Sequence, residues 1–191
     1  MKNKNLSIGL PLFKYHPDPI RSGSFVKSKK KCECCKKARS YIYTGPAYCE
    51  DDLEEALCPW CIGDGSAHKK YDATFVDEAV FPEDIPPAVV EEISCRTPGY
   101  SAWQSEQWFS CCRDAMAFLE PVGVPEIRER YPQIENDVLA YIVSELGLSH
   151  GDAKTMLESL RRDAGPTAYV FQCLHCGAYK TFVDGIFDIE V

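Results

Sequence analysis

The sequence lacks several features that would define its class at once. No apolar run approaches the roughly 20 residues that a membrane-spanning helix needs, and the N-terminal stretch has no sustained apolar core of a signal peptide. The chain has four histidines but no His-Glu zinc motif, phosphate loop, nucleophile elbow or Ser/His/Asp order. We therefore expect a cytoplasmic protein without a membrane span, and we find no positive reason to expect an enzyme.

Cysteine, by contrast, is abundant, with 11 in 191 residues. In an oxidising compartment this richness would suggest a disulfide framework, whereas in a reducing cytosol it more often indicates metal. The odd count and the absence of an export signal both favour metal. A formal net charge of −8 argues against nucleic-acid binding by the surface as a whole.

The pattern of residues predicts an α+β fold in a single domain over residues 1–191, and nothing in it requires oligomerisation to fold. A zinc-knuckle region over 27–70 and a C-terminal Cys-x-x-Cys hairpin over 166–191 flank a helical region over 99–165, with about three helices. We expect these helices at 101–120, 134–146 and 149–164, a short additional helix at "PAVVEEIS" and strands at "SYIYTG", "TAYVFQ" and "AYKTFVD".

The first predicted metal site combines two Cys-x-x-Cys pairs. Cys32 and Cys35 form one pair, and Cys58 and Cys61 form the other after 22 intervening residues. A tight turn brings two such sulfurs to neighbouring corners of a tetrahedron, and a second pair completes four ligands for zinc. Closed sites of this kind leave no position for water, which disfavours metal-assisted hydrolysis.

A thiol-redox enzyme is the competing interpretation of Cys58-Pro-Trp-Cys61. A redox cysteine is activated at the N-terminus of a helix, but the following "IGDG" is a poor helix former and no βαβ context is present. Cys34 and Cys49 are alternative ligands at the first site, although small buried hydrophobes are the more ordinary interpretation of both.

A second, independent half-site is Cys173-Leu-His-Cys176-Gly177, which needs two more ligands. We expect Cys112 with either Cys111 or Cys95, and His175 is a further candidate. Cys111 and Cys112 would point about 100° apart on the predicted helix, so both can bind one ion only if the helix ends or distorts there. The alternative is a hairpin whose two thiols pack without metal.

Two further features allow two interpretations each. Seven cationic side chains against one Glu33 over residues 27–39 fit either compensation of an anionic zinc–thiolate centre or a nucleic-acid contact, and we favour compensation. His16 in "FKYHPDPIRSG" lies near Asp18 and Arg21 and could line a site, although a turn held by Asp and Pro is the more ordinary account.

Taken in order, the stretches "FKYHPDPIRSGSF", "CPWCIGDGSAHKKYDATF", "RTPGYSAWQSEQW" and "YVFQCLHCGAYKTFVDG" resemble the CbrC family of small bacterial proteins. The resemblance runs from Phe13 to Gly185. The family pattern has a His-Cys pair followed by another cysteine where this chain has Cys111-Cys112 and then Met116. The resemblance therefore implies Cys112 as a ligand and places Cys111 where a histidine is expected.

The resemblance also implies a function, because the family is linked by name to colicin tolerance. We accordingly expect a non-enzymatic, zinc-binding immunity or tolerance factor, an antitoxin whose partner is a nuclease-type toxin domain. An acidic protein suits capture of a basic nuclease domain. A nucleic-acid-associated zinc-ribbon protein and the thiol-redox enzyme are the alternatives.

Overall fold

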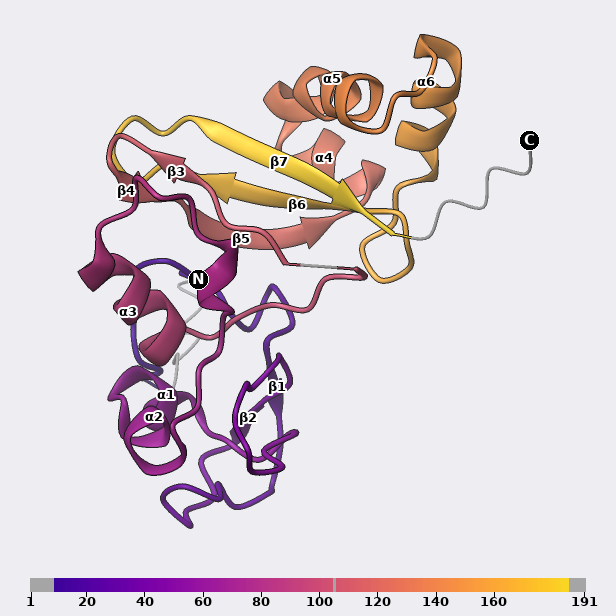
Figure 1. The fold of residues 1–191 in the computed structure, drawn as a ribbon. Coiled ribbons are helices and arrows are strands. Elements are labelled where there is room, and N and C mark those ends of the chain that lie inside the picture. The colour runs from indigo at the N-terminus through magenta and orange to yellow at the C-terminus, as the bar shows by residue number, and fades with distance from the viewer. Residues whose placement is uncertain (1–8, 105, 186–191) are drawn as a thin grey trace, which may run out of the picture.

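A computed structural model of the chain describes residues 9–104 and 106–185. It has a central antiparallel sheet, a layer of helices on one face and an N-terminal part against the other (Figure 1). The helices are α1 (Pro59–Gly63), α2 (Ser66–Tyr71), α3 (Pro87–Arg96), α4 (Val124–Arg130), α5 (Glu135–Glu145) and α6 (His150–Ser159). The strands are β1 (Phe25–Lys27), β2 (Tyr41–Tyr43), β3 (Ser110–Cys111), β4 (Asp114–Ala115), β5 (Ala117–Val122), β6 (Thr167–Gln172) and β7 (Tyr179–Asp184), and single 3₁₀ turns lie at Glu78–Val80 and Pro132–Ile134. The α+β class is confirmed.

The central sheet has the order β5-β6-β7 and is buried on both faces. Ala168 and Val170 of β6 face a cluster built by α4, α5 and α6, because successive side chains of a strand point to opposite faces. Tyr169 and Phe171 therefore face the other way, into an aromatic cluster that includes Trp108. This double burial explains why "TAYVFQ" is an almost uninterrupted apolar run.

The helical layer follows the predicted pattern in part. The helices predicted over 134–146 and 149–164 are confirmed as α5 and α6, although α6 ends at Ser159. Ser149 caps α6 as predicted, since its Oγ accepts a hydrogen bond of 3.2 Å from the backbone N–H of Asp152. The predicted strands at both ends and the helix at "PAVVEEIS" are also confirmed, as β2, β6, β7 and α3.

The helix predicted over 101–120 is wrong, and with it the description of 99–165 as a helical region. This stretch forms the β3–β4 hairpin and then β5. Residues 115–118 are all buried. In a strand that is buried on both faces, apolar residues occur at every spacing, so intervals of three and four fit a helix without indicating one. Pairing of β5 with β6 decides the conformation, and Pro121 is tolerated because β5 lies at the sheet edge.

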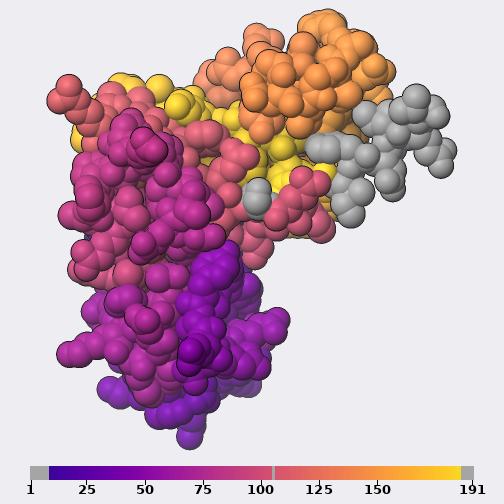
Figure 2. All heavy atoms as spheres, in the orientation of Figure 1, coloured from indigo at the N-terminus to yellow at the C-terminus, as the bar shows by residue number. Residues whose placement is uncertain are grey.

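The N-terminal part packs β1, β2, α1 and α2 around its own apolar cluster, and the molecule bends between this part and the helical layer (Figure 2). The two glycines after Cys61 do not prevent helices here. Gly63 ends α1, and Gly65, with φ +76°, provides the left-handed joint that starts α2.

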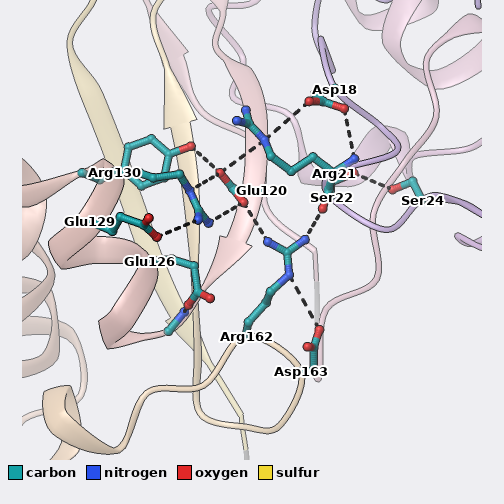
Figure 3. A network of polar contacts seen from close by, with 12 residues as sticks. Asp18, Arg21, Ser22, Ser24, Glu120, Glu126, Glu129, Arg130, Arg162 and Asp163 are labelled. Carbon is teal, nitrogen blue, oxygen red and sulfur yellow. Dashed lines mark hydrogen bonds and ion pairs between the residues drawn. The ribbon is translucent and has the colours of Figure 1, made fainter. Parts of the chain in front are cut away.

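A buried carboxylate connects the N-terminal part to the sheet and the helices. The Glu120 side chain on β5 is fully buried and accepts a hydrogen bond of 2.6 Å from the Tyr131 hydroxyl. Three guanidinium groups approach it, at 2.7 Å from Arg162, 2.9 Å from Arg130 and 3.4 Å from Arg21 (Figure 3). Burial opposes ionisation of Glu120, but the hydrogen bonds from Tyr131 and Arg162 outweigh it and lower the pKa of the carboxyl.

Within the described residues, no helix has both the length and the apolar character to cross a membrane.

Candidate metal centres

The first centre lies in the N-terminal part, where the loop after β1 meets the start of α1. The four sulfur atoms of Cys32, Cys35, Cys58 and Cys61 all lie within 4.8 Å of one another. Cys32 Sγ is 3.8 Å from Cys61 Sγ, and Cys35 Sγ is 3.9 Å from Cys58 Sγ. Zinc–sulfur bonds of about 2.3 Å in a tetrahedron place ligand sulfurs about 3.8 Å apart. The arrangement can therefore hold one metal ion.

The backbone turn at Cys32 brings its partner Cys35 round to the same point. The N–H of Lys36 donates to the carbonyl oxygen of Cys32 at 2.7 Å, and the N–H of Cys32 donates to the carbonyl oxygen of Lys37 at 3.0 Å. Lys36 closes this turn in the left-handed conformation, with φ +59°. On the other side, Cys58 is the residue before α1, and its N–H donates to Cys32 Sγ at 3.3 Å. Such donors stabilise a thiolate.

The second centre joins two hairpins at one end of the central sheet (Figure 1). Cys111 and Cys112 come from the β3–β4 turn, and Cys173 and Cys176 come from the turn between β6 and β7; their sulfurs also lie within 4.8 Å of one another. Cys111 Sγ is 3.7 Å from the sulfurs of both Cys112 and Cys176. The structure thus brings together Cys112, Cys173, Cys176 and Cys111, whereas Cys95 lies in α3 and belongs to neither group.

Adjacent cysteines reach one point because they occupy a turn and not a helix. Cys111 pairs with Asp114, and the two residues between them, Cys112 and Arg113, have φ values of +55° and +61°. Two left-handed residues between paired strands are the mark of a type I′ turn, which reverses the chain within two residues. The sequence-based objection to using both cysteines rested on the wrong helix prediction.

The second knuckle repeats the backbone pattern of the first. Gly177 N–H donates to the carbonyl oxygen of Cys173 at 3.1 Å, and Cys173 N–H donates to that of Ala178 at 2.8 Å. Gly177, with φ +74°, takes the left-handed position that Lys36 takes in the first knuckle. Cys173 Sγ accepts from the N–H groups of His175 and Cys176 at 3.4 and 3.5 Å, and these donors lower the pKa of the Cys173 thiol.

The two centres differ in how far they are enclosed. Cys32, Cys58 and Cys61 are buried at the first centre, whereas at the second only Cys173 is buried and both Cys112 and Cys176 are exposed. The lysines near the first centre, which we expected to offset its charge, are exposed along residues 27–37.

A carboxylate supports the second centre without belonging to the sulfur group. Asp114 Oδ2 lies 2.8 Å from His175 Nε2 and 3.1 Å from Lys14 Nζ, and its Oδ1 accepts from the Tyr15 hydroxyl at 2.7 Å. Burial alone would raise the pKa of Asp114, but these hydrogen bonds outweigh it and lower the pKa to about 2. His175 therefore holds the knuckle to Asp114 through its ring. No local pattern predicts this contact, because 61 positions separate the two residues.

The remaining predicted alternatives lie outside both groups. Cys34 Sγ is 3.7 Å from Ser66 Oγ, and Cys49 Sγ is 3.2 Å from the carbonyl oxygen of Asp51. The argument from glycine against the redox interpretation was wrong, because α1 does follow Cys58. What separates this pair from a free dithiol is that each of its sulfurs contacts a sulfur of the Cys32–Cys35 knuckle.

Comparison with known proteins gives related chains of similar length. The model of a family described as uncharacterised, UPF0167, matches residues 10–185. UPF0167 proteins of Mycobacterium bovis and Mycobacterium tuberculosis are each 43% identical over 176 residues, which cover 92% of this chain and 93% of theirs. One from Pseudomonas aeruginosa is 40% identical over 170 residues, covering 88% of this chain and 93% of its own. No solved structure matches the chain.

Proposed function

We propose that this chain, which belongs to the uncharacterised protein family UPF0167, is a cytoplasmic zinc-stapled binding protein that captures and neutralises a basic, nuclease-type toxin domain. The observation that carries the proposal is a separation of charge along the chain. Residues 76–185 contain 18 Asp and Glu side chains against eight Lys and Arg, a net charge of −10, whereas residues 9–75 contain nine against 11, a net charge of +2. The resemblance to the CbrC family supplies the toxin class.

Zinc fits both centres by the chemistry of their donors. Four thiolates at tetrahedral spacing suit Zn²⁺, which would be held by Cys32, Cys35, Cys58 and Cys61 at one centre and by Cys111, Cys112, Cys173 and Cys176 at the other. Bound there, zinc supplies a cross-link between turns and no open position for chemistry. Each closed centre adds a charge of −2, which takes residues 76–185 from −10 to −12.

The surface that would meet the toxin is an acidic face over residues 77–92. Asp77, Glu78, Glu83, Asp84 and Glu91 are all exposed there, and Arg96 is the single cationic residue between positions 76 and 100. Several of these carboxylates border a shallow groove with the apolar side chains Phe81, Ile85 and Val90. A negative surface of this kind accelerates encounter with a positive partner and discriminates against acidic ones.

The test is binding and inhibition across a panel of purified nuclease-toxin domains. The variant Glu78→Gln, Glu83→Gln, Asp84→Asn, Glu91→Gln should lower the association rate with a bound toxin about tenfold at low salt. Glu50→Gln, Asp51→Asn, Asp52→Asn, Glu54→Gln is the matched control, because it removes the same charge from four exposed residues of the N-terminal part. Absence of binding across the panel would reject the proposal.

A second candidate function is association with nucleic acid through the N-terminal part. Its observation is an exposed lysine surface in which Lys69 and Lys70 of α2 join the lysines of residues 27–37, with the Arg39 guanidinium 5.1 Å from the centre of the Trp60 ring. Binding by this surface should weaken steeply with added salt and be lost when the lysines are neutralised. Affinity that is independent of salt would exclude it.

A further inference from the structure

A buried histidine and a serine form a close pair away from both cysteine centres. The His16 side chain is fully buried, and its ring packs edge-on against Phe118 with 5.0 Å between ring centres. Its Nε2 lies 2.6 Å from Ser22 Oγ, and its Nδ1 lies 2.7 Å from the carbonyl oxygen of Pro98. The ring is therefore held at both nitrogens, between the N-terminal loop and the segment that follows α3.

The proton positions in this group follow from its partners. A carbonyl oxygen accepts only, so His16 Nδ1 carries the hydrogen. Burial lowers the pKa of His16 to about 4, so the ring is neutral near pH 7 and Nε2 has a free lone pair for the Ser22 hydroxyl. Ser24 donates its own hydrogen to the carbonyl oxygen of Gly99 at 2.8 Å, and its Oγ is 3.4 Å from Ser22 Oγ, so the contact of 2.6 Å with His16 Nε2 is the shorter one open to the Ser22 hydroxyl. This is the tautomer that a general base requires.

Ser22 also borders space that a small group can enter. It lines a cavity of about 90 Å³ whose other lining residues include Gly23, Thr44, Gly45 and Pro121. Gly23 has φ +93°, and the N–H of Ser22 donates to the carbonyl oxygen of Asp18 at 3.1 Å, so the serine sits in a defined turn. The turn is anchored from the other side by Arg162, which donates to the carbonyl oxygen of Arg21 beside Ser22 (Figure 3).

We propose that Ser22 and His16 are the nucleophile and general base of an acyl-transfer site that takes small acyl esters. Ser22 Oγ forms a bond to the acyl carbon while its proton passes to His16 Nε2. The ester C–O bond then breaks, and the leaving alcohol takes that proton. Water releases the acyl group by the reverse order of proton transfers, so the cycle needs no oxidant or metal. The carbonyl of Pro98 positions the ring, as a carboxylate does in other nucleophile–base–orienter arrangements. The small volume of the cavity favours a short acyl group over a long acyl chain.

This activity goes beyond toxin capture and uses none of its residues. The acidic face lies at residues 77–92, whereas His16 contacts the carbonyl oxygen of Pro98 and Ser22 contacts His16. Loss of one activity therefore leaves the other measurable.

The decisive experiment is labelling of the metal-loaded full chain with an ethoxy-fluorophosphonate, which phosphonylates activated serines, followed by peptide mass spectrometry. We expect one adduct, on Ser22. It should be absent in Ser22→Ala and should form about 100-fold more slowly in His16→Gln, because a positioned base contributes at least that factor. Ser144→Ala, which removes an exposed hydroxyl on α5 away from the cavity, is the control and should label at the normal rate. Folding of each variant is checked by circular dichroism, and His16→Asn replaces the glutamine variant if that one unfolds.

Two results would overturn the proposal. The first is a wild-type chain that takes no label on Ser22, and the second is labelling that proceeds equally fast without the imidazole. The acyl-group assignment has its own test, since p-nitrophenyl acetate should be hydrolysed at least about tenfold faster than p-nitrophenyl octanoate, with Ser22→Ala as the background. Equal rates, or a preference for octanoate, would contradict the small acyl group.

Discussion

The two cysteine centres share one backbone device and differ in what surrounds it. Each has a Cys-x-x-Cys turn closed by a left-handed residue, Lys36 in one and Gly177 in the other, with matching N–H to carbonyl hydrogen bonds. The first centre is enclosed by the N-terminal core, whereas the second leaves Cys112 and Cys176 exposed at a hairpin tip. The turn thus fixes the ligand geometry, and the surroundings decide how firmly an ion is retained.

The centres also differ in the parts of the fold they join. The first connects two neighbouring segments whose side chains form the core of the N-terminal part, including Cys32, Cys58 and Cys61 themselves. The second connects the β3–β4 hairpin to the β6–β7 turn, beside strands that already pair along their length. Loss of metal should therefore damage the first region more than the second.

The largest expected effect is that of Cys58→Ser. It should remove one of two bound zinc ions per chain and lower the melting temperature by about 15 °C, because structural zinc contributes several kcal/mol to folding. Cys176→Ser should also remove one ion but lower the melting temperature by only about 5 °C. Metal analysis and thermal unfolding measure both. Cys34→Ser, a half-buried thiol outside both groups, is the control and should keep two ions.

Metal content in the wild-type chain also decides between structural and redox roles for Cys58 and Cys61. A purified protein without zinc, whose Cys58–Cys61 pair cycles with a dithiol, would restore the thiol-enzyme interpretation.

The next effect concerns the Glu120 network, which joins the two regions. Glu120→Gln should lower the free energy of unfolding by about 3 kcal/mol, because it removes the buried counter-charge shared by three partly exposed guanidinium groups. The lowered pKa keeps the carboxyl ionised above pH 5, so this difference should not change between pH 8 and pH 5. Urea unfolding at both pH values is the measurement, and Glu129→Gln, an exposed carboxylate on α4, should have almost no effect.

The rate of zinc release should differ between the two centres even in the wild-type chain. With a colorimetric chelator in excess, one zinc ion should leave at least about tenfold faster than the other, and Cys176→Ser should abolish the fast phase. Dilute hydrogen peroxide should release zinc from the second centre before the first, because exposed thiolates are oxidised first. Release of both ions in a single phase would show that the difference in exposure does not control exchange.

The smallest effect tests the shared turn itself. Gly177→Ala should cost about 1 kcal/mol of stability, since an L residue with a side chain resists the left-handed conformation while no heavy atom stands in its way. Lys36→Gly, the matched change in the first knuckle, should cost nothing measurable. If Lys36→Gly lost as much stability as Gly177→Ala, the two turns would not share the same backbone requirement.

Local patterns predicted what depends on local chemistry. Cysteine spacing indicated both knuckles, and Ser149 with the apolar stripe after it indicated α6. The stretch 101–120 failed because β5 is buried on both faces, where helix and strand patterns cannot be told apart. The contact between His16 and Pro98 could not be predicted from the sequence, because 82 positions separate the two residues and only the folded chain brings them together.

The turn at Cys112 and Arg113 gives the chain a way to adjust its hold on metal from outside the ligand set. Two residues with side chains occupy left-handed positions that glycine would adopt freely, so part of the metal-binding free energy is used to keep the hairpin closed. A glycine at position 113 would release that cost and tighten binding, although Arg113 offers no atom to the ion. Substitutions in the hairpin turn can therefore change the metal affinity of this centre while its four cysteine ligands stay the same.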